Sequence, residues 1–286
     1  MIVFYNGKIL ELENVAVSPF DRAFQFGDGV YEVIRYYPEI FFEYESHLDR
    51  LKSSLKKIEI SFTAFENVES VLYELIQKNN LEDQLSIAYI QISRGNQFPR
   101  RHFYNENLEP SIFICVEKYP ARVDEMKNGV RVGLEEDIRW MRCDIKTTSL
   151  LPNVLSKQRA VKNGLTEIIW HRNGFITEGT QTNVCFIKNS ELITPPLSNL
   201  ILPGITRKIV LKLCKKLGIR YTERDIKLTE LKDFDEILLL STTAEVTPVR
   251  ELDGNIINGS MPGPICKLLQ SEYQKLYIIP RLARSI

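Results

Sequence analysis

Apolar and polar positions repeat along the chain with two different periods, one typical of helices and one of strands. Residues 46–58 carry apolar side chains three or four positions apart, which predicts an amphipathic helix. Ser46 and Asp49 form a capping-box pattern at its expected start. A second helix of this kind is expected from Thr63 to Asn79–Asn80, where the periodicity ends.

Strands are predicted between these helices and after them. Residues 1–10 predict a hairpin that turns at Asn6–Gly7, a dipeptide that tolerates the positive φ of a two-residue turn. Residues 85–93 and 111–117 are apolar on both alternating faces, which predicts strands buried on both sides. Residues 118–129 then combine a proline, several charges and a glycine, so we expect a linker there.

The second half is expected to mix helices and strands irregularly. A helix should run from Pro152 to Asn163–Gly164, because proline suits a first helical turn and glycine follows a last one. The other expected elements are strands at 129–135, 183–188 and 236–249, a hairpin at 166–179 turning at Asn173–Gly174, and helices at 202–219 and 264–276. This order favours an α+β fold. The linker divides it into domains at 1–119 and 120–286.

Composition narrows the class of protein. The chain has 286 residues, of which 44% are hydrophobic and 26% charged, as in globular proteins of about two domains. Thirty-seven basic and 37 acidic residues balance, so no net charge attracts nucleic acid or anionic lipid. Five scattered cysteines and the lack of a long apolar run predict a cytoplasmic protein that is not a membrane protein. With three histidines and no ligand spacing, no metal site is expected.

Several chemically active residues stand at the ends of predicted elements. Lys146 precedes a helix, Glu178 ends a hairpin, Gly204 to Thr206 open a helix, and Ser241 and Thr242 end a buried strand. Each feature alone is more often structural: a surface charge, a helix start or a turn. Together they supply an amine for a Schiff base, an anion for a ring nitrogen and a helix N-terminus for a phosphate. Pyridoxal phosphate requires these three groups.

Longer motifs resemble a known family. DRAFQFGDGVYEV, HLDRL, PRRH, EDIRWMRCDIK, TEG, LPGITR and STTAEVTPV are spread over nearly the whole chain. They resemble the fold-type IV pyridoxal-phosphate enzymes, or class IV aminotransferases, and most of all their D-amino-acid-specific members. The resemblance implies ping-pong transamination between D-amino acids and 2-oxo acids through pyridoxamine phosphate, with the cofactor between a small N-terminal and a larger C-terminal domain.

The resemblance also implies roles for individual residues. Lys146, placed in the C-terminal domain, would be the Schiff-base lysine and the general acid and base, with cations such as Arg139 favouring its neutral amine. Glu178 would pair with the pyridine nitrogen, and Arg139 would contact the phenolic oxygen. The remaining expected cofactor contacts are Arg50, Leu202, Ile205, Thr206, Ser241 and Thr242.

Substrate recognition is expected at Arg100, His102 and Tyr31, which resemble the carboxylate-binding groups of D-specific members. Alternate residues of an extended loop point the same way, so Arg100 and His102 should converge while Arg101 faces elsewhere. Family members take this pair from a neighbouring subunit, so the resemblance implies a homodimer.

Two departures bear on substrate range. The loop before Arg100 is one residue longer than the D-specific pattern, and Thr180–Thr182 stand where serines are usual. A branched-chain L-amino-acid aminotransferase stays an alternative, although such enzymes usually have tyrosine where Leu151 stands. A 4-amino-4-deoxychorismate lyase and a cofactor-binding regulator without activity are further alternatives, the last disfavoured by the intact Lys146.

Overall fold

The computed structural model describes residues 1–257, 259 and 261–284, with only the backbone of 279–284. Its mixture of helices and strands confirms the α+β class. Two compact units are present. Unit 1 comprises Met1–Pro120 and Ile145–Ser149, and unit 2 comprises Ala121–Asp144 and the chain from Leu150 onward.

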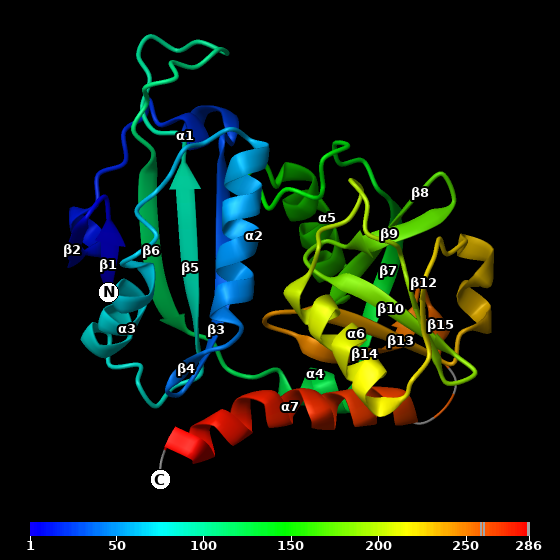
Figure 1. Cartoon of the computed structure of the whole chain (residues 1–286). Coiled ribbons are helices and arrows are strands. Elements are labelled where there is room, and N and C mark those ends of the chain that lie inside the picture. Colours follow the sequence, from blue (N-terminus) through cyan, green and yellow to red (C-terminus); the bar gives the residue numbers. More distant parts are fainter. Residues whose placement is uncertain (258, 260, 285–286) are drawn as a thin grey trace. The chain divides into compact units, whose positions relative to one another are not determined.

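Unit 1 is an antiparallel six-stranded sheet covered by two helices (Figure 1). Helices α2 (Tyr44–Lys57) and α3 (Val68–Lys78) pack their apolar sides against alternate residues of β3, β5 and β6, which form one core with them. The strand order is β2-β1-β6-β5-β3-β4. The remaining bounds are β1 Ile2–Tyr5, β2 Lys8–Glu11, β3 Gly29–Tyr37, β4 Ile40–Phe41, β5 Ser86–Ser93, β6 Ser111–Lys118, α1 Arg22–Phe26 and the 3-10 helix η1 Leu12–Asn14.

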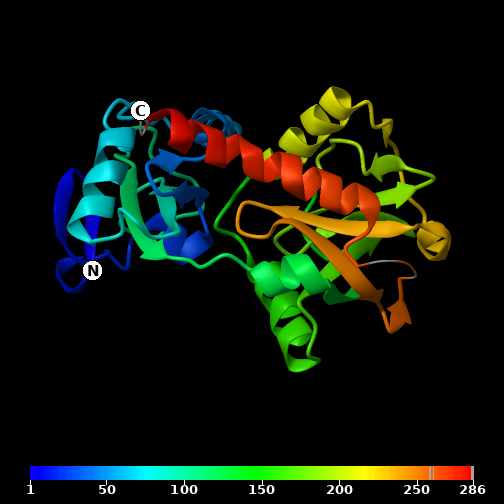
Figure 2. The same ribbon diagram turned by 90° about the horizontal axis from the view of Figure 1, so that it is seen from below.

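Unit 2 is a nine-stranded mixed sheet with helices packed on it. Helix α7 (Pro264–Arg284) lies beside α6 (Ile205–Leu217) and contacts β13 and β14 (Figure 2). The main strand order is β12-β11-β10-β13-β14-β7-β8-β9, with β15 paired to β14. The bounds are β7 Val130–Glu136, β8 Glu167–Arg172, β9 Phe175–Gly179, β10 Asn183–Lys188, β11 Glu191–Thr194, β12 Tyr221–Glu223, β13 Glu236–Ser241, β14 Glu245–Leu252, β15 Asn255–Ile256, α4 Val123–Asn128, α5 Leu151–Lys162 and the 3-10 helix η2 Leu228–Asp233.

Local signals placed some elements well and misplaced others. Both predicted hairpins form, with positive φ at Asn6–Gly7 and Asn173–Gly174. The capping-box interpretation of Ser46 was wrong, because α2 begins earlier and the Ser46 hydroxyl donates to the Glu43 carboxylate over 2.6 Å.

Two further boundaries were wrong. Helix α3 begins at Val68 rather than near Thr63. The expected single strand at 236–249 is two strands, β13 and β14, which pair as an antiparallel hairpin. A turn at 242–244 reverses the chain, and Glu245 follows with φ of 50°. Ser241 therefore ends β13, as expected of a strand end, whereas Thr242 and Thr243 form the turn of a hairpin.

The Lys146 segment belongs to unit 1, not to the expected C-terminal domain. Residues 145–149 lie along the start of β3, where Val30 and Thr147 form a bridge. The Tyr31 N–H donates to the Lys146 carbonyl over 3.0 Å, and the Thr148 N–H donates to the Gly29 carbonyl over 3.0 Å. These backbone bonds explain why the chain leaves unit 1 after Pro120 yet returns to it for five residues.

Candidate active site

Within unit 1, Lys146 projects beside a tyrosine pair on β3 and β5. Its Nζ lies 4.3 Å from the centroid of the Tyr31 ring, and that ring stacks on Tyr89 with centroids 5.6 Å apart. The Lys146 backbone N–H donates to the Ser54 hydroxyl of α2 over 3.3 Å. Neighbours Ile145 and Thr147 are buried, so the backbone is fixed while the amine stays partly accessible. The expected pair Lys146 and Tyr31 is thus brought together.

Arg50 is held by a buried carboxylate that the sequence reasoning missed. Glu32 accepts from Arg50 Nε over 2.7 Å and from Arg50 Nη2 over 2.9 Å, and His47 Nδ1 lies 2.8 Å from its second oxygen. Burial alone would raise the pKa of Glu32, but Arg50 and His47 outweigh it and hold that pKa well below its usual value. Burial lowers the pKa of His47, which Glu32 only partly offsets. The guanidinium of Arg50 is therefore oriented by a permanent anion.

Arg100 and His102 converge on one aromatic ring, as their alternation predicted. The Arg100 guanidinium carbon lies 4.2 Å from the centroid of Phe26, and the His102 ring centroid lies 5.5 Å from it. Both side chains remain exposed, so their donors are open to an anion. Arg101, between them, contributes its carbonyl to Arg22.

Within unit 2, Glu178 lies buried on β9 and collects three donors. Arg139 Nη1 donates to Oε1 over 2.7 Å, while Asn183 Nδ2 and the Leu202 N–H donate to Oε2 over 2.9 and 3.0 Å. Burial raises the pKa of Glu178, and the Arg139 guanidinium offsets this only in part. Two oxygens offer about four acceptor positions. Among the described groups these three donors leave Oε1 able to accept one more hydrogen bond.

Asp137 fixes Arg139 on Glu178. Its carboxylate accepts from Arg139 Nε over 3.0 Å and from Nη2 over 2.8 Å, and the guanidinium carbon lies 4.3 Å from the Trp170 ring centroid. Burial disfavours the charged guanidinium, but Glu178 and Asp137 outweigh it and raise the pKa of Arg139 above its usual range. The expected effect of Arg139 on Lys146 assumed an uncompensated cation. Arg139 is instead paired with two carboxylates of its own unit, those of Glu178 and Asp137.

Asn183 joins Glu178 to the start of α6. Its Nδ2 also donates to the Leu202 carbonyl over 2.9 Å, and its Oδ1 lies where a side chain on Gly204 would begin, 1.8 Å from an ideal Cβ. Only glycine permits this approach. Ile205 and Thr206 follow as buried first-turn residues of α6, which has no acidic residue in that turn.

Ser241 and Thr242 lie at the same edge of unit 2. Strands β10 and β13 pair Asn183 with Leu240, which places the following turn beside Asn183. The Ser241 hydroxyl accepts from the Ala244 N–H over 3.1 Å, so it stabilises its own turn. Unit 2 thus places Arg139, Leu202 and the start of α6 around Glu178 and Asn183, with the turn after β13 beside Asn183.

Four residues of these clusters were missed: Glu32, His47, Asp137 and Asn183. For one of them, Glu32, the sequence contains a signal that could have revealed its role. Glu32 occupies a core-facing position of β3 between Val30 and Ile34, both fully buried, and a carboxylate at such a position requires charged partners. Asp137 and Asn183 stand at strand ends, where polar residues are ordinary, so only tertiary contacts distinguish them.

The part of the chain that the structure describes contains no helix with the length and apolar character needed to cross a bilayer.

Comparison with known proteins gives consistent results. Residues 29–252 match the family described as amino-transferase class IV. The chain is 41% identical over 276 residues to a D-alanine aminotransferase of Bacillus licheniformis, covering 96% of each chain. It is 38% identical to one of Listeria monocytogenes, covering 96% of this chain and 95% of the relative. A solved branched-chain amino acid aminotransferase of Escherichia coli superposes with a TM-score of 0.89 at 25% identity, covering 96% and 94% of the two chains.

Proposed function

The chain belongs to the class IV aminotransferase family, and we propose that it is a D-amino-acid aminotransferase that uses pyridoxal phosphate to interconvert D-amino acids, such as D-alanine, and 2-oxo acids. The observation that carries the D-specific part is the convergence of Arg100 and His102 on Phe26. Relatives of 38–41% identity over nearly the whole chain are named for this activity, which supports the same conclusion.

The residues present fit the cofactor. When bound, pyridoxal phosphate supplies an aldehyde that links to an amine and a ring that accepts electrons from the substrate. Glu178 has one acceptor position left for a ring N–H, and its raised pKa means that it would gain from a cationic donor. The first turn of α6, free of acidic side chains, suits a phosphate, and Arg50, oriented by Glu32, would add a cation for phosphate oxygens.

Each residue then has a defined task. Lys146 carries the amine that would hold the cofactor's aldehyde carbon, and the same amine would serve as the base for the proton of the substrate α-carbon. Glu178, held by Arg139, would accept a hydrogen bond from the protonated ring nitrogen. Arg100 and His102 bind the substrate carboxylate, with the Tyr31 hydroxyl as a third donor. Donor and acceptor use these groups in turn, so one oxo acid leaves before the next enters.

A homodimer in the cytoplasm is part of this proposal. Large aromatic side chains on and near the Arg100 loop are highly exposed: Phe24 by 75%, Phe98 by 77% and Phe103 by 72%. Exposed apolar groups of this size typically mark a protein interface. Sedimentation equilibrium should give twice the monomer mass of 33.2 kDa.

A branched-chain L-amino-acid aminotransferase is the second candidate, because solved enzymes of that name superpose well. Leu151 stands where those enzymes usually have tyrosine, and the Arg100–His102 pair favours D-substrates. The lyase alternative gains no support from the relatives reported above.

The test compares D-alanine, L-leucine and aminodeoxychorismate, the first two with 2-oxoglutarate, in the purified enzyme. D-alanine should be turned over and should bleach the yellow cofactor band, whereas L-alanine should not. Equal bleaching by L-substrates would contradict the proposal.

A matched pair of variants tests the carboxylate site. Arg100→Ala removes a charged hydrogen bond of about 1.5–3 kcal/mol, so the KM for D-alanine should rise about 10- to 150-fold. Arg101→Ala removes the same charge one residue away and should change KM less than about twofold, because Arg101 contributes a backbone carbonyl. Equal effects of the two variants would refute the assigned role of Arg100.

A further inference from the structure

One buried arginine binds the backbone of the Arg100–His102 loop. Arg22, the first residue of α1, donates from Nη1 to the Arg101 carbonyl over 2.8 Å and from Nη2 to the His102 carbonyl over 3.0 Å. A longer contact of 3.5 Å reaches the Phe103 carbonyl. One guanidinium thus binds three consecutive carbonyls of the loop, and its side chain is only 5% exposed.

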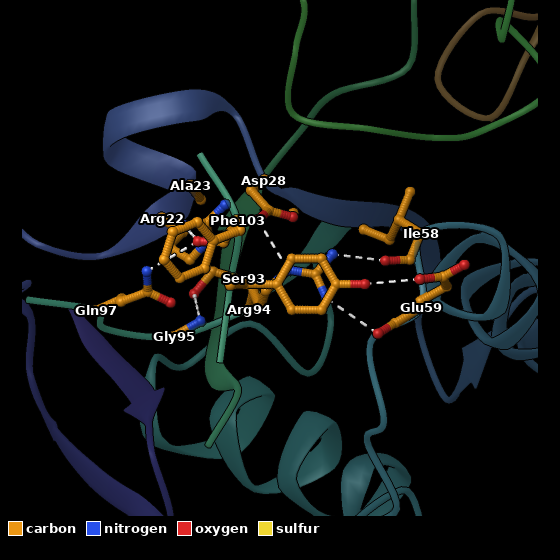
Figure 3. A network of polar contacts seen from close by, with 12 residues as sticks. Arg22, Ala23, Asp28, Ile58, Glu59, Ser93, Arg94, Gly95, Gln97 and Phe103 are labelled. Carbon is orange, nitrogen blue, oxygen red and sulfur yellow. Dashed lines mark hydrogen bonds and ion pairs between the residues drawn. The ribbon is translucent and has the colours of Figure 1, made fainter. Parts of the chain in front are cut away.

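A shared carboxylate ties Arg22 to the framework of unit 1 (Figure 3). Asp28 Oδ2 accepts from Arg22 Nε and from Arg94 Nε, each over 2.8 Å. Burial alone would raise the pKa of Asp28, but its bonds to Arg94 and Arg22 lower it, so Asp28 remains charged. Arg94 in turn donates to the carbonyls of Ile58 and Glu59 over 2.6 and 3.0 Å, just beyond α2.

The same helix holds the side chains of the loop. Phe26 lies four residues after Arg22, and residues with this spacing share a helix face. Arg22 therefore fixes the loop backbone while Phe26 contacts the side chains of Arg100 and His102. The guanidinium of Arg22 itself lies 4.8 Å from the Phe26 ring centroid.

Contacts outside residues 101–103 also hold this loop. The Tyr104 hydroxyl donates to the Glu59 carboxylate over 2.6 Å, and the Phe98 ring lies 4.9 Å from that of Phe20. Phe98 and Phe103 are largely exposed, so no apolar core encloses it. Gln97 supplies two bonds within the loop, donating to the Phe103 carbonyl over 2.9 Å and accepting from the Asn105 N–H over 2.8 Å. Arg22 is the group that connects residues 101–103 to a buried charge network.

We propose that Arg22 is a positioning residue that preorganises Arg100 and His102 for a substrate carboxylate. This inference rests on the proposed function. A loop fixed before binding does not lose conformational entropy when the substrate arrives, so its order improves affinity. Lysine in place of Arg22 would keep the positive charge beside Asp28, but its point charge cannot reproduce a planar fork across adjacent carbonyls.

The test compares Arg22→Lys with Arg35→Lys in the holoenzyme. Arg35 is a matched control, because it is buried on β3 of the same unit and its Nη1 donates to the Tyr119 carbonyl over 2.7 Å. Trypsin cuts after Arg100 and Arg101, and cutting requires the loop to open. Arg22→Lys should be cut there about tenfold faster or more, and hydrogen exchange of the loop amides should rise similarly. Arg35→Lys should behave as the wild type does.

Kinetics supply the second readout. Arg22→Lys should raise the KM for D-alanine about 5- to 50-fold with kcat within about threefold and the cofactor band unchanged. Unchanged loop cleavage would overturn the inference, and so would a loosened loop with an unchanged KM. If the wild type does not turn over D-alanine, the proposed function fails, and the cleavage rate still decides whether Arg22 anchors the loop.

A second variant keeps the test decisive should Arg22→Lys fail to fold. Gln97→Ala removes a second side-chain anchor of the loop and leaves the buried charges intact. Like Arg22→Lys, it should loosen the loop and raise the KM for D-alanine. An unchanged KM would count against loop order as the source of affinity.

Discussion

Replacing Glu32 with glutamine should destabilise unit 1 by about 3–5 kcal/mol, the usual cost of removing one partner from a buried ion pair. Glu32 is fully buried and makes two bonds to Arg50, of 2.7 and 2.9 Å. It also lies 2.8 Å from His47 Nδ1. Glutamine keeps one acceptor oxygen but no charge, so the guanidinium of Arg50 stays buried without this anion.

The magnitude can be measured by urea unfolding of the cofactor-free protein, in which ligand binding does not contribute. With a slope of about 1–3 kcal/mol per molar urea, the loss should lower the midpoint by about 1–5 M. Both tryptophans, Trp140 and Trp170, belong to unit 2. Circular dichroism therefore reports both units, whereas tryptophan fluorescence reports unit 2 and should shift less.

Glu167 provides the matched control for this substitution. It is equally buried, on β8, but its partners are neutral: the Thr180 hydroxyl and N–H, the Thr182 hydroxyl and the Ile168 N–H. Glu167→Gln leaves no buried cation, so it should cost only about 1–3 kcal/mol. If Glu32→Gln costs no more than Glu167→Gln, the reasoning about the loss of a buried anionic partner is refuted.

Three further outcomes are expected. The unfolding free energy should fall as the pH is lowered from 7 to 5. Burial lowers the pKa of His47 in the folded protein, so the unfolded chain takes up a proton first, near pH 6.5. His47→Gln should reduce this pH dependence in urea titrations. Asp137→Asn should lower kcat about tenfold, or about 1.4 kcal/mol, by loosening Arg139, while steady-state assays find KM for D-alanine within about threefold. Gly204→Ala should displace Asn183, cost about 1–3 kcal/mol and release cofactor on gel filtration; full retention of cofactor would contradict this.

Short-range patterns were sufficient for much of the fold. Asn6–Gly7 and Asn173–Gly174 marked their hairpins, and Pro152 with Gly164 bracketed α5, because turn and cap chemistry depends on adjacent residues. The start of α2 was misplaced for the opposite reason. Glu43 adopts a left-handed conformation with φ of 55°, which no local pattern predicts.

The residues of the candidate site were predictable from the sequence, but the residues that hold them in place were not. Motifs that resemble those of the family indicated Lys146, Glu178 and the Arg100–His102 pair, whose convergence followed from alternation. Their supports come from distant segments: Arg22 binds carbonyls about 80 positions away, and Glu32 meets Arg50 across the sheet–helix core. Such pairs are set by tertiary packing, which a single sequence does not encode in any local spacing.

The return of five residues to unit 1 makes the two units interleaved in the gene. A fragment ending at Pro120 would lack the strip that satisfies the Tyr31 N–H and the Gly29 carbonyl, so β3 would carry an open edge there. No single cut yields two complete halves. An engineered protein that exchanges or truncates unit 1 would therefore have to include residues 145–149, with Lys146, as part of that unit.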